Sequence, residues 1–213
     1  MLIPMQTLHD VHGVTPKGVV HLGAHLGEEA PDYAAAGVER AIWVEGNPEL
    51  IGPLTNNVSR FPGHRAMHAV VSDTDGAATT FRFASFTMSS SILPMTGHLR
   101  QYPSIVEVGT MPCESITIDS LMAREGEDPS GYDMLNVDLE GAELMAIRGA
   151  SALLPFIKWV YAEVYFEDLY EGCALVEELD AYLGDRGFKR TLTEDAYYLG
   201  EFKGFGDALY TRQ

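Results

Sequence analysis

The sequence predicts a single α/β domain over residues 1–213, with a mostly parallel sheet and an antiparallel end. Short apolar runs alternate with helical patterns along most of the chain, which is typical of strand–helix–strand units. The last two strand-like runs, at residues 188–194 and 206–212, have no helical pattern between them. Because parallel neighbours need a crossover, usually helical, we expect this last pair to form an antiparallel hairpin.

The first part of the chain predicts two strands, each followed by a helix. Residues 19–22 form an apolar run that enters a glycine turn, and residues 28–37 follow as a short helix that a glycine ends. A second strand is expected at residues 41–45. Asn47 is a good helix cap and Pro48 suits the first helical position, so the next helix is expected to begin there.

The middle of the chain is less regular. A third strand is expected at residues 68–73, and residues 78–85 alternate like a half-exposed strand. Residues 86–110 are rich in Ser, Pro and Gly and show no clean period. Long irregular segments in compact domains are often functional, so we expect an active-site loop there.

The second half of the chain returns to a clear alternation. A fourth core strand is expected within residues 132–141, with its helix at 142–154. The fifth strand is expected at residues 159–166, and residues 174–187 form an amphipathic helix with a glycine stop. Residues 1–17 are expected to be an extension before the first strand.

Composition limits the partners and the compartment. The net charge of −17 predicts no nucleic-acid partner and no anionic membrane surface, because both need clustered Lys and Arg. The two cysteines, Cys113 and Cys173, indicate neither a disulfide framework nor a zinc site. The first ten residues lack a signal pattern, and no apolar run is long enough to span a membrane. We therefore expect a cytoplasmic protein, of an oligomeric state that the sequence leaves open.

Polar or turn residues follow almost every expected strand. In an open α/β sheet, ligands bind beyond the carboxyl ends of the strands, so these residues are the candidates for the site. In strand order they are Gly23, Ala24, His25, Gly27, Glu45, Asn47, Ser72, Asp73, Asp138, Glu140, Glu163 and Tyr165.

The first glycine turn and the acid after the second strand indicate a nucleoside site. Glycines in the turn allow a ligand to approach the backbone, and Glu45 is placed to accept hydrogen bonds from a ribose diol. The turn is not a G-x-G-x-x-G fingerprint, and acids stand where a pyrophosphate needs free N–H groups. A ligand with adenosine and no phosphate fits better, and S-adenosylmethionine is such a ligand. The alternative is that the glycines and the acid serve only the fold.

Six segments carry a resemblance to a known family. They are VVHLGAHLGEE, VEGNPE, AVVSDTDG, SSSIL, ITIDSL and NVDLEGAELMAIRGA. From about residue 19 to residue 163 the chain resembles the FkbM-type methyltransferases, which depend on S-adenosylmethionine. The resemblance implies a Rossmann-like class I methyltransferase fold with a mostly parallel seven-stranded sheet and an antiparallel C-terminal strand. It also implies O-methylation of a hydroxyl on a sugar, glycan or natural product, and hence a small-molecule or carbohydrate acceptor.

The chain departs from the family pattern at four positions. His21 and His25 stand where the family usually has Asp and Asn, Gly46 stands where proline is usual, and Asn136 stands where lysine is usual. We expect His21 to help hold the methionine half of the cofactor, with a core histidine as the alternative. The expected cofactor-binding residues are His21, Gly23, Ala24, His25, Gly27, Glu45, Asn47, Ser72 and Asp73.

Methyl transfer to oxygen needs a base near the acceptor hydroxyl. Asp138 is the first candidate and Glu163 the second, against the alternatives of a turn former and a structural carboxylate. Glu140 and Glu143 open a helix, and the helix dipole alone would explain both. Asp138, Glu140 and Glu163 are also a conceivable site for a hard metal ion, but their spacing does not confirm one, and we predict no metal.

Two other functions remain open at this point. A nicotinamide-dependent oxidoreductase would share the sheet, but the missing dinucleotide fingerprint argues against it. A nucleoside-binding module without catalysis is the second alternative, and Asn136 and His21 favour it because they depart from the family pattern.

Overall fold

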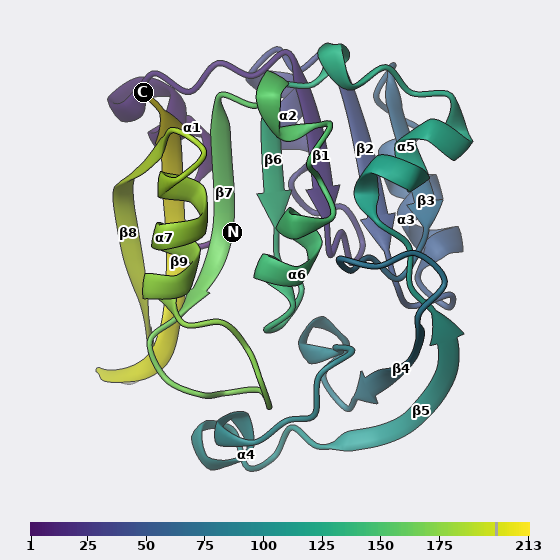
Figure 1. Cartoon of the computed structure of the whole chain (residues 1–213), viewed down its shortest axis with the longest axis vertical. Coiled ribbons are helices and arrows are strands. Elements are labelled where there is room, and N and C mark those ends of the chain that lie inside the picture. The colour runs from purple at the N-terminus through teal and green to yellow at the C-terminus, as the bar shows by residue number, and fades with distance from the viewer. Residues whose placement is uncertain (199) are drawn as a thin grey trace.

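Seven strands form one twisted sheet in the order β3-β2-β1-β6-β7-β9-β8 (Figure 1). The structure is a computed structural model that describes residues 1–198 and 200–213. The strands are β1 (Gly18–Leu22), β2 (Arg40–Glu45), β3 (His64–His68), β6 (Met134–Val137), β7 (Trp159–Tyr165), β8 (Phe188–Tyr198) and β9 (Glu201–Arg212). β9 runs antiparallel to β7 and β8, and all other neighbours in this sheet are parallel. The predicted fold class and the antiparallel end are confirmed.

Helices cover both faces of this sheet (Figure 1). On one face pack α1 (Met5–His12), α2 (Ala30–Ala35) and α3 (Ile51–Val58), and on the other α5 (Ile118–Glu125), α6 (Glu143–Arg148) and α7 (Val176–Gly184). Short 3₁₀ turns, η2 (Pro129–Gly131) and η3 (Leu154–Phe156), connect elements of the second half. β1 and β6 are buried along their whole length, as expected for central strands of a sheet covered on both faces.

A two-stranded antiparallel ribbon extends beyond the carboxyl ends of the main strands (Figure 1). It consists of β4 (Ala78–Ala84) and β5 (Glu107–Glu114), and the connection between them contains η1 (Thr87–Ser89) and α4 (Gly97–Gln101). The prediction of an irregular segment at 86–110 is therefore wrong where α4 and the start of β5 occur. The first four residues of β5 are all exposed, so the strand has no alternation of apolar and polar residues to reveal it.

Two predicted boundaries are also wrong. The helix expected to begin at Pro48 begins at Ile51, because Asn47 Oδ1 accepts a hydrogen bond from Glu49 N (3.0 Å) in a turn before the helix. The third strand lies at His64–His68 rather than at 68–73. β3 is an edge strand of the sheet and carries polar residues. The apolar run that follows it therefore resembles a strand more closely than β3 itself does.

The turns after β1 and β6 approach each other closely. The amide of Asp138 donates to the carbonyl of Leu22 (3.0 Å), and the amide of Gly23 donates to the carbonyl of Val44 (2.9 Å). Gly23 has a φ of 79°, and a Cβ on it would lie 1.6 Å from the carbonyl oxygen of Asp138. Only glycine can occupy this position without displacing the turn after β6.

Substituting this glycine should disrupt the junction of the two turns. Gly23→Ala adds both left-handed strain and a contact with backbone, whereas Gly37→Ala, at a φ of 81° with open space around it, adds the strain alone. We expect Gly37→Ala to lower the free energy of unfolding by about 1–2 kcal/mol and Gly23→Ala to lower it clearly further. Urea unfolding measures both, and equal losses would mean that the close approach does not constrain the fold.

Candidate active site

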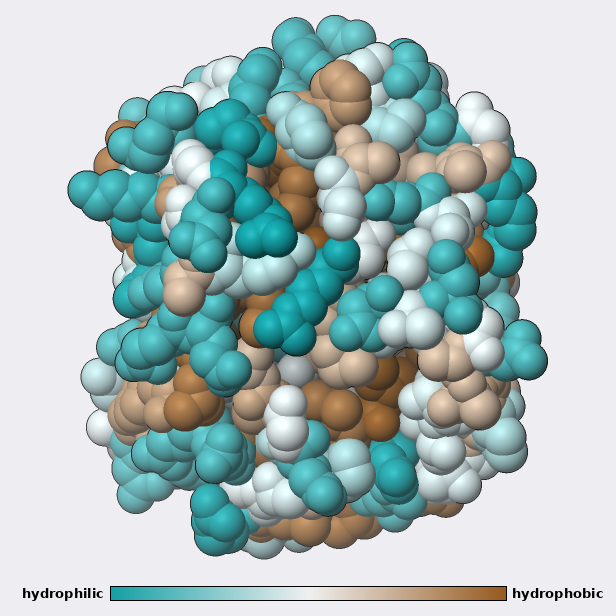
Figure 2. Space-filling view, in the orientation of Figure 1, coloured by the Kyte–Doolittle hydropathy of each residue, from teal (hydrophilic) through white to brown (hydrophobic). Residues whose placement is uncertain are grey.

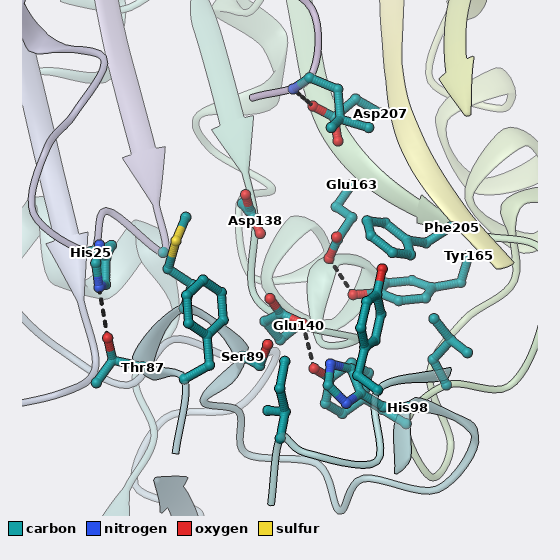
Figure 3. A pocket seen from close by; sticks show the side chains of 18 of the residues that line it. His25, Thr87, Ser89, His98, Asp138, Glu140, Glu163, Tyr165, Phe205 and Asp207 are labelled. Carbon is teal, nitrogen blue, oxygen red and sulfur yellow. Dashed lines mark hydrogen bonds between the residues drawn. The ribbon is translucent and has the colours of Figure 1, made fainter. Parts of the chain in front are cut away.

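A cavity of about 420 Å³ opens at the carboxyl ends of the strands (Figure 3). Its volume is in the range of small-molecule sites. The ends of β1, β2, β6, β7 and β9 form its wall together with residues 1–2 and parts of 86–105. Hydrophobic residues gather on the surface between α6 and α4 (Figure 2), and Phe86 and Met88 are half-exposed lining residues.

Glu45 is a buried carboxylate held by the backbone of two turns. Its Oε2 accepts from His25 N (2.8 Å) and its Oε1 from Asn47 N (2.6 Å). Burial raises the pKa of this carboxyl, while these two hydrogen bonds oppose that shift. Each oxygen keeps a lone pair that can accept from a ligand hydroxyl.

A smaller apolar pocket adjoins the cavity and shares Gly23 and Glu45 with it. Val44, Val70 and Phe81 are among its lining residues. An apolar slot next to a carboxylate matches the two parts of a nucleoside, because the ring needs apolar walls and the ribose needs acceptors.

His25 lines the cavity and connects the first turn to η1. Its Nδ1 lies 2.7 Å from Glu28 Oε1 and its Nε2 lies 2.9 Å from Thr87 Oγ1 (Figure 3). The hydrogen bond with Glu28 raises the pKa of this histidine. Since both ring nitrogens have partners, His25 positions the η1 segment over the site.

Six expected cofactor residues do not line the cavity, and one of them, His21, lies in the core. Ala24 and Asn47 are buried behind its wall, and a Cβ on Gly27 would meet Val58 and Leu54 of α3. Ser72 and Asp73 were expected at the end of a third strand. They lie instead in the turn before β4, where Ser72 N donates to Ile116 O (3.0 Å), because β3 ends before them.

Asp138 and Glu163, the two expected bases, both line the cavity (Figure 3). Burial, together with the negative charge of Asp207, raises the pKa of Asp138 to about 7. Within residues 1–198 and 200–213, no group donates a hydrogen bond to the Asp138 carboxylate. Glu163 is 8% exposed and one of its oxygens accepts from the Tyr165 hydroxyl. Asp138 is thus the carboxylate with free acceptor sites and a pKa near neutrality.

Glu140 and Glu143 have different roles from the helix-dipole role expected for both. Glu143 is buried, and its Oε1 accepts from Leu139 N (2.8 Å) and Gly141 N (3.2 Å), which fixes the turn after β6. Glu140 has a φ of 54°, a strained value for a residue with a side chain, and its carboxylate lines the cavity. Its Oε2 accepts from the Tyr170 hydroxyl.

Several lining residues were not expected from the sequence. They are Met1, Leu2, Leu169, Phe205 and Asp207, while Phe86, Thr87, Met88, Ser89, His98, Tyr102 and Ile105 were expected only as part of the segment 86–110. Asp207 lies opposite Glu163 in the β7–β9 register and accepts hydrogen bonds from Tyr161 and from Leu2 N. Its place within the "GDALYTR" strand was a signal, since a lone acid in an apolar strand needs a partner or a function.

A family model described as the methyltransferase FkbM domain matches residues 21–190. The chain belongs to the FkbM methyltransferase family. The cofactor of this family is S-adenosylmethionine, as the resemblance implied. A search of curated proteins finds no match to this chain.

Solved structures of methyltransferases share the fold of this FkbM protein. Magnesium protoporphyrin IX methyltransferase of Synechocystis PCC 6803, with S-adenosylmethionine bound, has a TM-score of 0.50 at 13% identity, with 98% of this chain and 79% of that chain covered. The methyltransferase domain of the bacterial protein CtHen1 has a TM-score of 0.50 at 10% identity, covering 98% of this chain and 96% of that chain. At such identities the likeness concerns the fold alone.

A third neighbour bears on the nucleic-acid prediction. Sp1610 of Streptococcus pneumoniae, whose proposed activity is methylation of tRNA, has a TM-score of 0.51 at 9% identity and covers 100% of this chain and 71% of its own. Because the fold also occurs there, the comparisons do not support excluding a nucleic-acid acceptor. No helix in the described ranges has the length and apolarity needed to cross a membrane.

Two departures from the FkbM pattern form a pair in the structure. His21 and Asn136 are direct neighbours in the β1–β6 register, and Asn136 Nδ2 lies 3.4 Å from His21 Nδ1. The Tyr33 hydroxyl also contacts Nδ1 (3.1 Å), and the His21 ring stacks on Trp43 at 4.8 Å. Burial lowers the pKa of His21 to about 4, so the ring is neutral. His21 is thus buried in the core and does not line the cavity, which favours the alternative of a core histidine over the expected contact with the cofactor.

A neutral His–Asn pair therefore stands where the family usually has an acid and a lysine. Neither residue lines the cavity, so the replacement changes the core and not the residues that line the cavity. Gly46, in place of the usual proline, is explained in a similar way. A Cβ at this position would lie 2.7 Å from the ring of Phe81, which lines the apolar pocket.

We expect the side chains at positions 21 and 136 to be energetically coupled. His21→Asp and Asn136→Lys each bury a charge without its counter-ion, which should lower the free energy of unfolding by about 3–5 kcal/mol. The double variant restores the charges of the family pattern. The double variant should lose less unfolding free energy than the two single variants together, by about 1–3 kcal/mol, as measured by urea unfolding in a double-mutant cycle. Additive losses would show that the two positions do not interact.

Proposed function

We propose that the chain is an S-adenosylmethionine-dependent methyltransferase that methylates a hydroxyl group of a carbohydrate or small metabolite. The observation that carries this proposal is the Asp138 carboxylate, which lines the cavity with no donor to it and has a pKa raised to about 7. A general base works best when its pKa lies near the working pH. The proposal rests also on the family of the chain.

The residues present fit the cofactor. Glu45 would accept the ribose hydroxyls, because its two oxygens are fixed by His25 N and Asn47 N and keep free lone pairs. The apolar pocket that shares Glu45 would hold the adenine ring. Gly23, which has no side chain and lines both spaces, lets a ligand pass between them.

When bound, S-adenosylmethionine supplies a methyl group on a sulfonium cation. Asp138 would accept the proton of the acceptor hydroxyl at a carboxylate oxygen as that hydroxyl gains its methyl group. Glu163 is the weaker candidate for this role, because the Tyr165 hydroxyl already occupies one of its oxygens. The aromatic side chains of the 86–105 segment would exclude water from the reacting groups.

The first test concerns Glu45. Loss of a carboxylate that accepts ligand hydroxyls should weaken binding of S-adenosylmethionine by about 1.5–3 kcal/mol per hydrogen bond, so Glu45→Ala should bind much less tightly in calorimetric titration. Glu49→Ala removes an exposed acid four residues away and should bind like the parent. Unchanged affinity in Glu45→Ala, with an unaltered melting temperature, would show that Glu45 serves only the fold.

The second test concerns Asp138. Asp138→Asn should leave the affinity for S-adenosylmethionine within a few fold but lower turnover by about 10²–10⁴, the usual contribution of a general base. In the parent protein, kcat/KM should rise with pH through the raised pKa of about 7, since only the deprotonated carboxylate accepts a proton.

Both halves of this second test have a contradicting result. A large loss of cofactor affinity in Asp138→Asn would make Asp138 a cofactor ligand and transfer the base role to Glu163. Unchanged turnover with an identified acceptor would remove Asp138 from the chemistry.

A further inference from the structure

The part of the cavity beyond Glu45 is strongly acidic. Among the described residues that line the cavity there is no Lys or Arg, and the amino group of Met1, which lies 3.3 Å from Glu29 Oε1, is a positive charge at its edge. Its acids are Glu45, Asp138, Glu140, Glu163 and Asp207. His25 is turned to Glu28 and Thr87 and does not offset this charge deep in the cavity. A phosphate or carboxylate would be repelled here, and a cation would be attracted.

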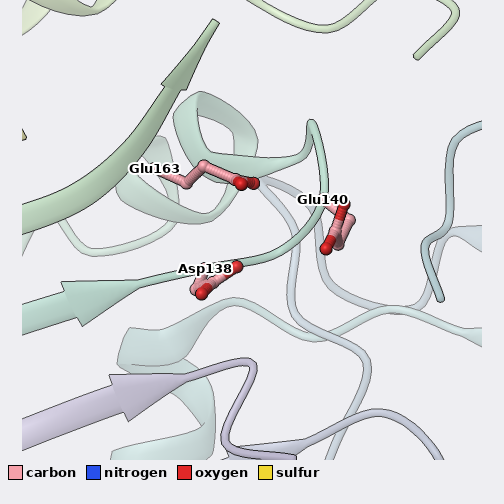
Figure 4. A group of neighbouring side chains, drawn as sticks. All are labelled: Asp138, Glu140 and Glu163. Atoms are coloured by element: carbon pink, nitrogen blue, oxygen red, sulfur yellow. The ribbon is translucent and has the colours of Figure 1, made fainter. Parts of the chain in front are cut away.

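Three of these carboxylates converge on one point (Figure 4). One oxygen each of Asp138, Glu140 and Glu163 lies within 4.8 Å of the others. Acceptors at about 2.8 Å from a tetrahedral ammonium nitrogen lie about 4.6 Å apart, which this spacing accommodates.

Aromatic rings surround this carboxylate cluster. The rings of Tyr165 and Tyr170 are 6.0 Å apart and nearly perpendicular, and Phe205 lies 6.4 Å from Tyr165. All three line the cavity. These rings give the cluster apolar walls, which suit the carbon skeleton of an organic ligand.

A second, independent feature in the same cavity indicates a ligand with further polar groups. His98 of α4 lines the cavity, is 4% exposed and has no hydrogen-bond partner at Nδ1 among the residues that the structure describes. Burial lowers the pKa of His98, so its ring is neutral and can exchange a hydrogen bond with a hydroxyl. Its ring lies 5.4 Å from that of Tyr170, whose hydroxyl donates to Glu140.

We propose that the methyl acceptor is an amino alcohol, most simply an amino sugar, whose protonated amine lies between Glu140 and Glu163 and whose neighbouring hydroxyl reaches Asp138. The amine and hydroxyl of such a unit are adjacent, so both fit within the cluster of three carboxylates. A further hydroxyl of the ligand supplies the partner that His98 Nδ1 lacks. This inference rests on the proposed function, because it names the class of acceptor for the same site.

The charge state of the cluster sets the pH dependence of acceptor binding. Burial and the negative charges of neighbouring carboxylates, first Asp138 for Glu140 and first Glu140 for Glu163, raise the pKa of both groups well above the ordinary value. A bound ammonium favours their charged forms, so binding releases protons. The affinity for an ammonium ligand should therefore fall as the pH is lowered, whereas the affinity for a neutral sugar should show no such fall.

The experiment compares one sugar in three forms. D-glucosamine, N-acetyl-D-glucosamine and D-glucose are titrated at about pH 7 into the protein saturated with S-adenosylhomocysteine, and binding is followed by ligand-observed NMR. We expect D-glucosamine to bind at least about tenfold more tightly than the two neutral sugars. Glu163→Gln and Glu140→Gln should remove this preference, and Asp73→Asn, an exposed acid outside the cavity, should keep it.

Several results would overturn the proposal. These are equal or tighter binding of the neutral sugars, no binding of D-glucosamine at millimolar concentration, and a preference that survives in Glu163→Gln. Tighter binding of D-glucose after addition of Mg²⁺ or Mn²⁺, lost in Glu163→Gln, would assign the carboxylates to a metal ion instead. Binding of S-adenosylhomocysteine is measured first, so its failure would refute the proposed function, and failure of the amine alone would refute only this inference.

Discussion

The site depends on the contact between the turns that follow the two central strands. The amide of Asp138 is hydrogen-bonded to Leu22, and Gly23 is hydrogen-bonded to Val44, so the ends of β6, β1 and β2 are joined in one backbone network. This network sets the position of Asp138 relative to Glu45. A side chain on Gly23 would separate the turns, which explains why the fold needs glycine there. The proposed base, Asp138, and the proposed ribose acceptor, Glu45, therefore share one rigid frame.

Electrostatic repulsion opposes this arrangement. Burial and neighbouring acids raise the pKa of Asp138 to about 7 and that of Glu143 to about 8, above their values in an unfolded chain. The folded state then binds more protons than the unfolded state between about pH 4 and these values. Its stability is highest at the acidic end of this window and declines as the pH rises through the folded pKa values. A cofactor sulfonium and a cationic acceptor would offset the repulsion, so the strain is concentrated where ligands bind.

Sequence reasoning found the part of the site that strand order determines. Gly23, Glu45, Asp138 and Glu163 end or follow strands whose apolar runs are clear, and the parallel sheet brings such ends to one edge. It assigned His21 to the cofactor, whereas the structure places this residue in the core. A strand that is buried on both faces shows no alternation of apolar and polar residues, so its sequence does not tell core positions from ligand-facing ones.

The residues that sequence reasoning missed, or listed without a role in the cavity as it did Glu140, come from geometry without a sequence period. Glu140 reaches the cavity only because it adopts a left-handed conformation within the turn that Glu143 fixes. His98 and Tyr102 belong to a segment with one short helix, and their approach to Tyr170 is a tertiary contact. Ser72 and Asp73 were assigned to the site because the edge strand was placed too late in the chain.

The central claim is that this cavity holds adenosine without phosphates, attached to a methyl donor. Calorimetric titration of the unmodified protein with S-adenosylmethionine, S-adenosylhomocysteine and NAD tests this claim most directly. We predict that the first two bind, each at one site per chain, and that NAD does not, because the turn after β1 lacks the dinucleotide fingerprint. Binding of NAD alone would contradict the account.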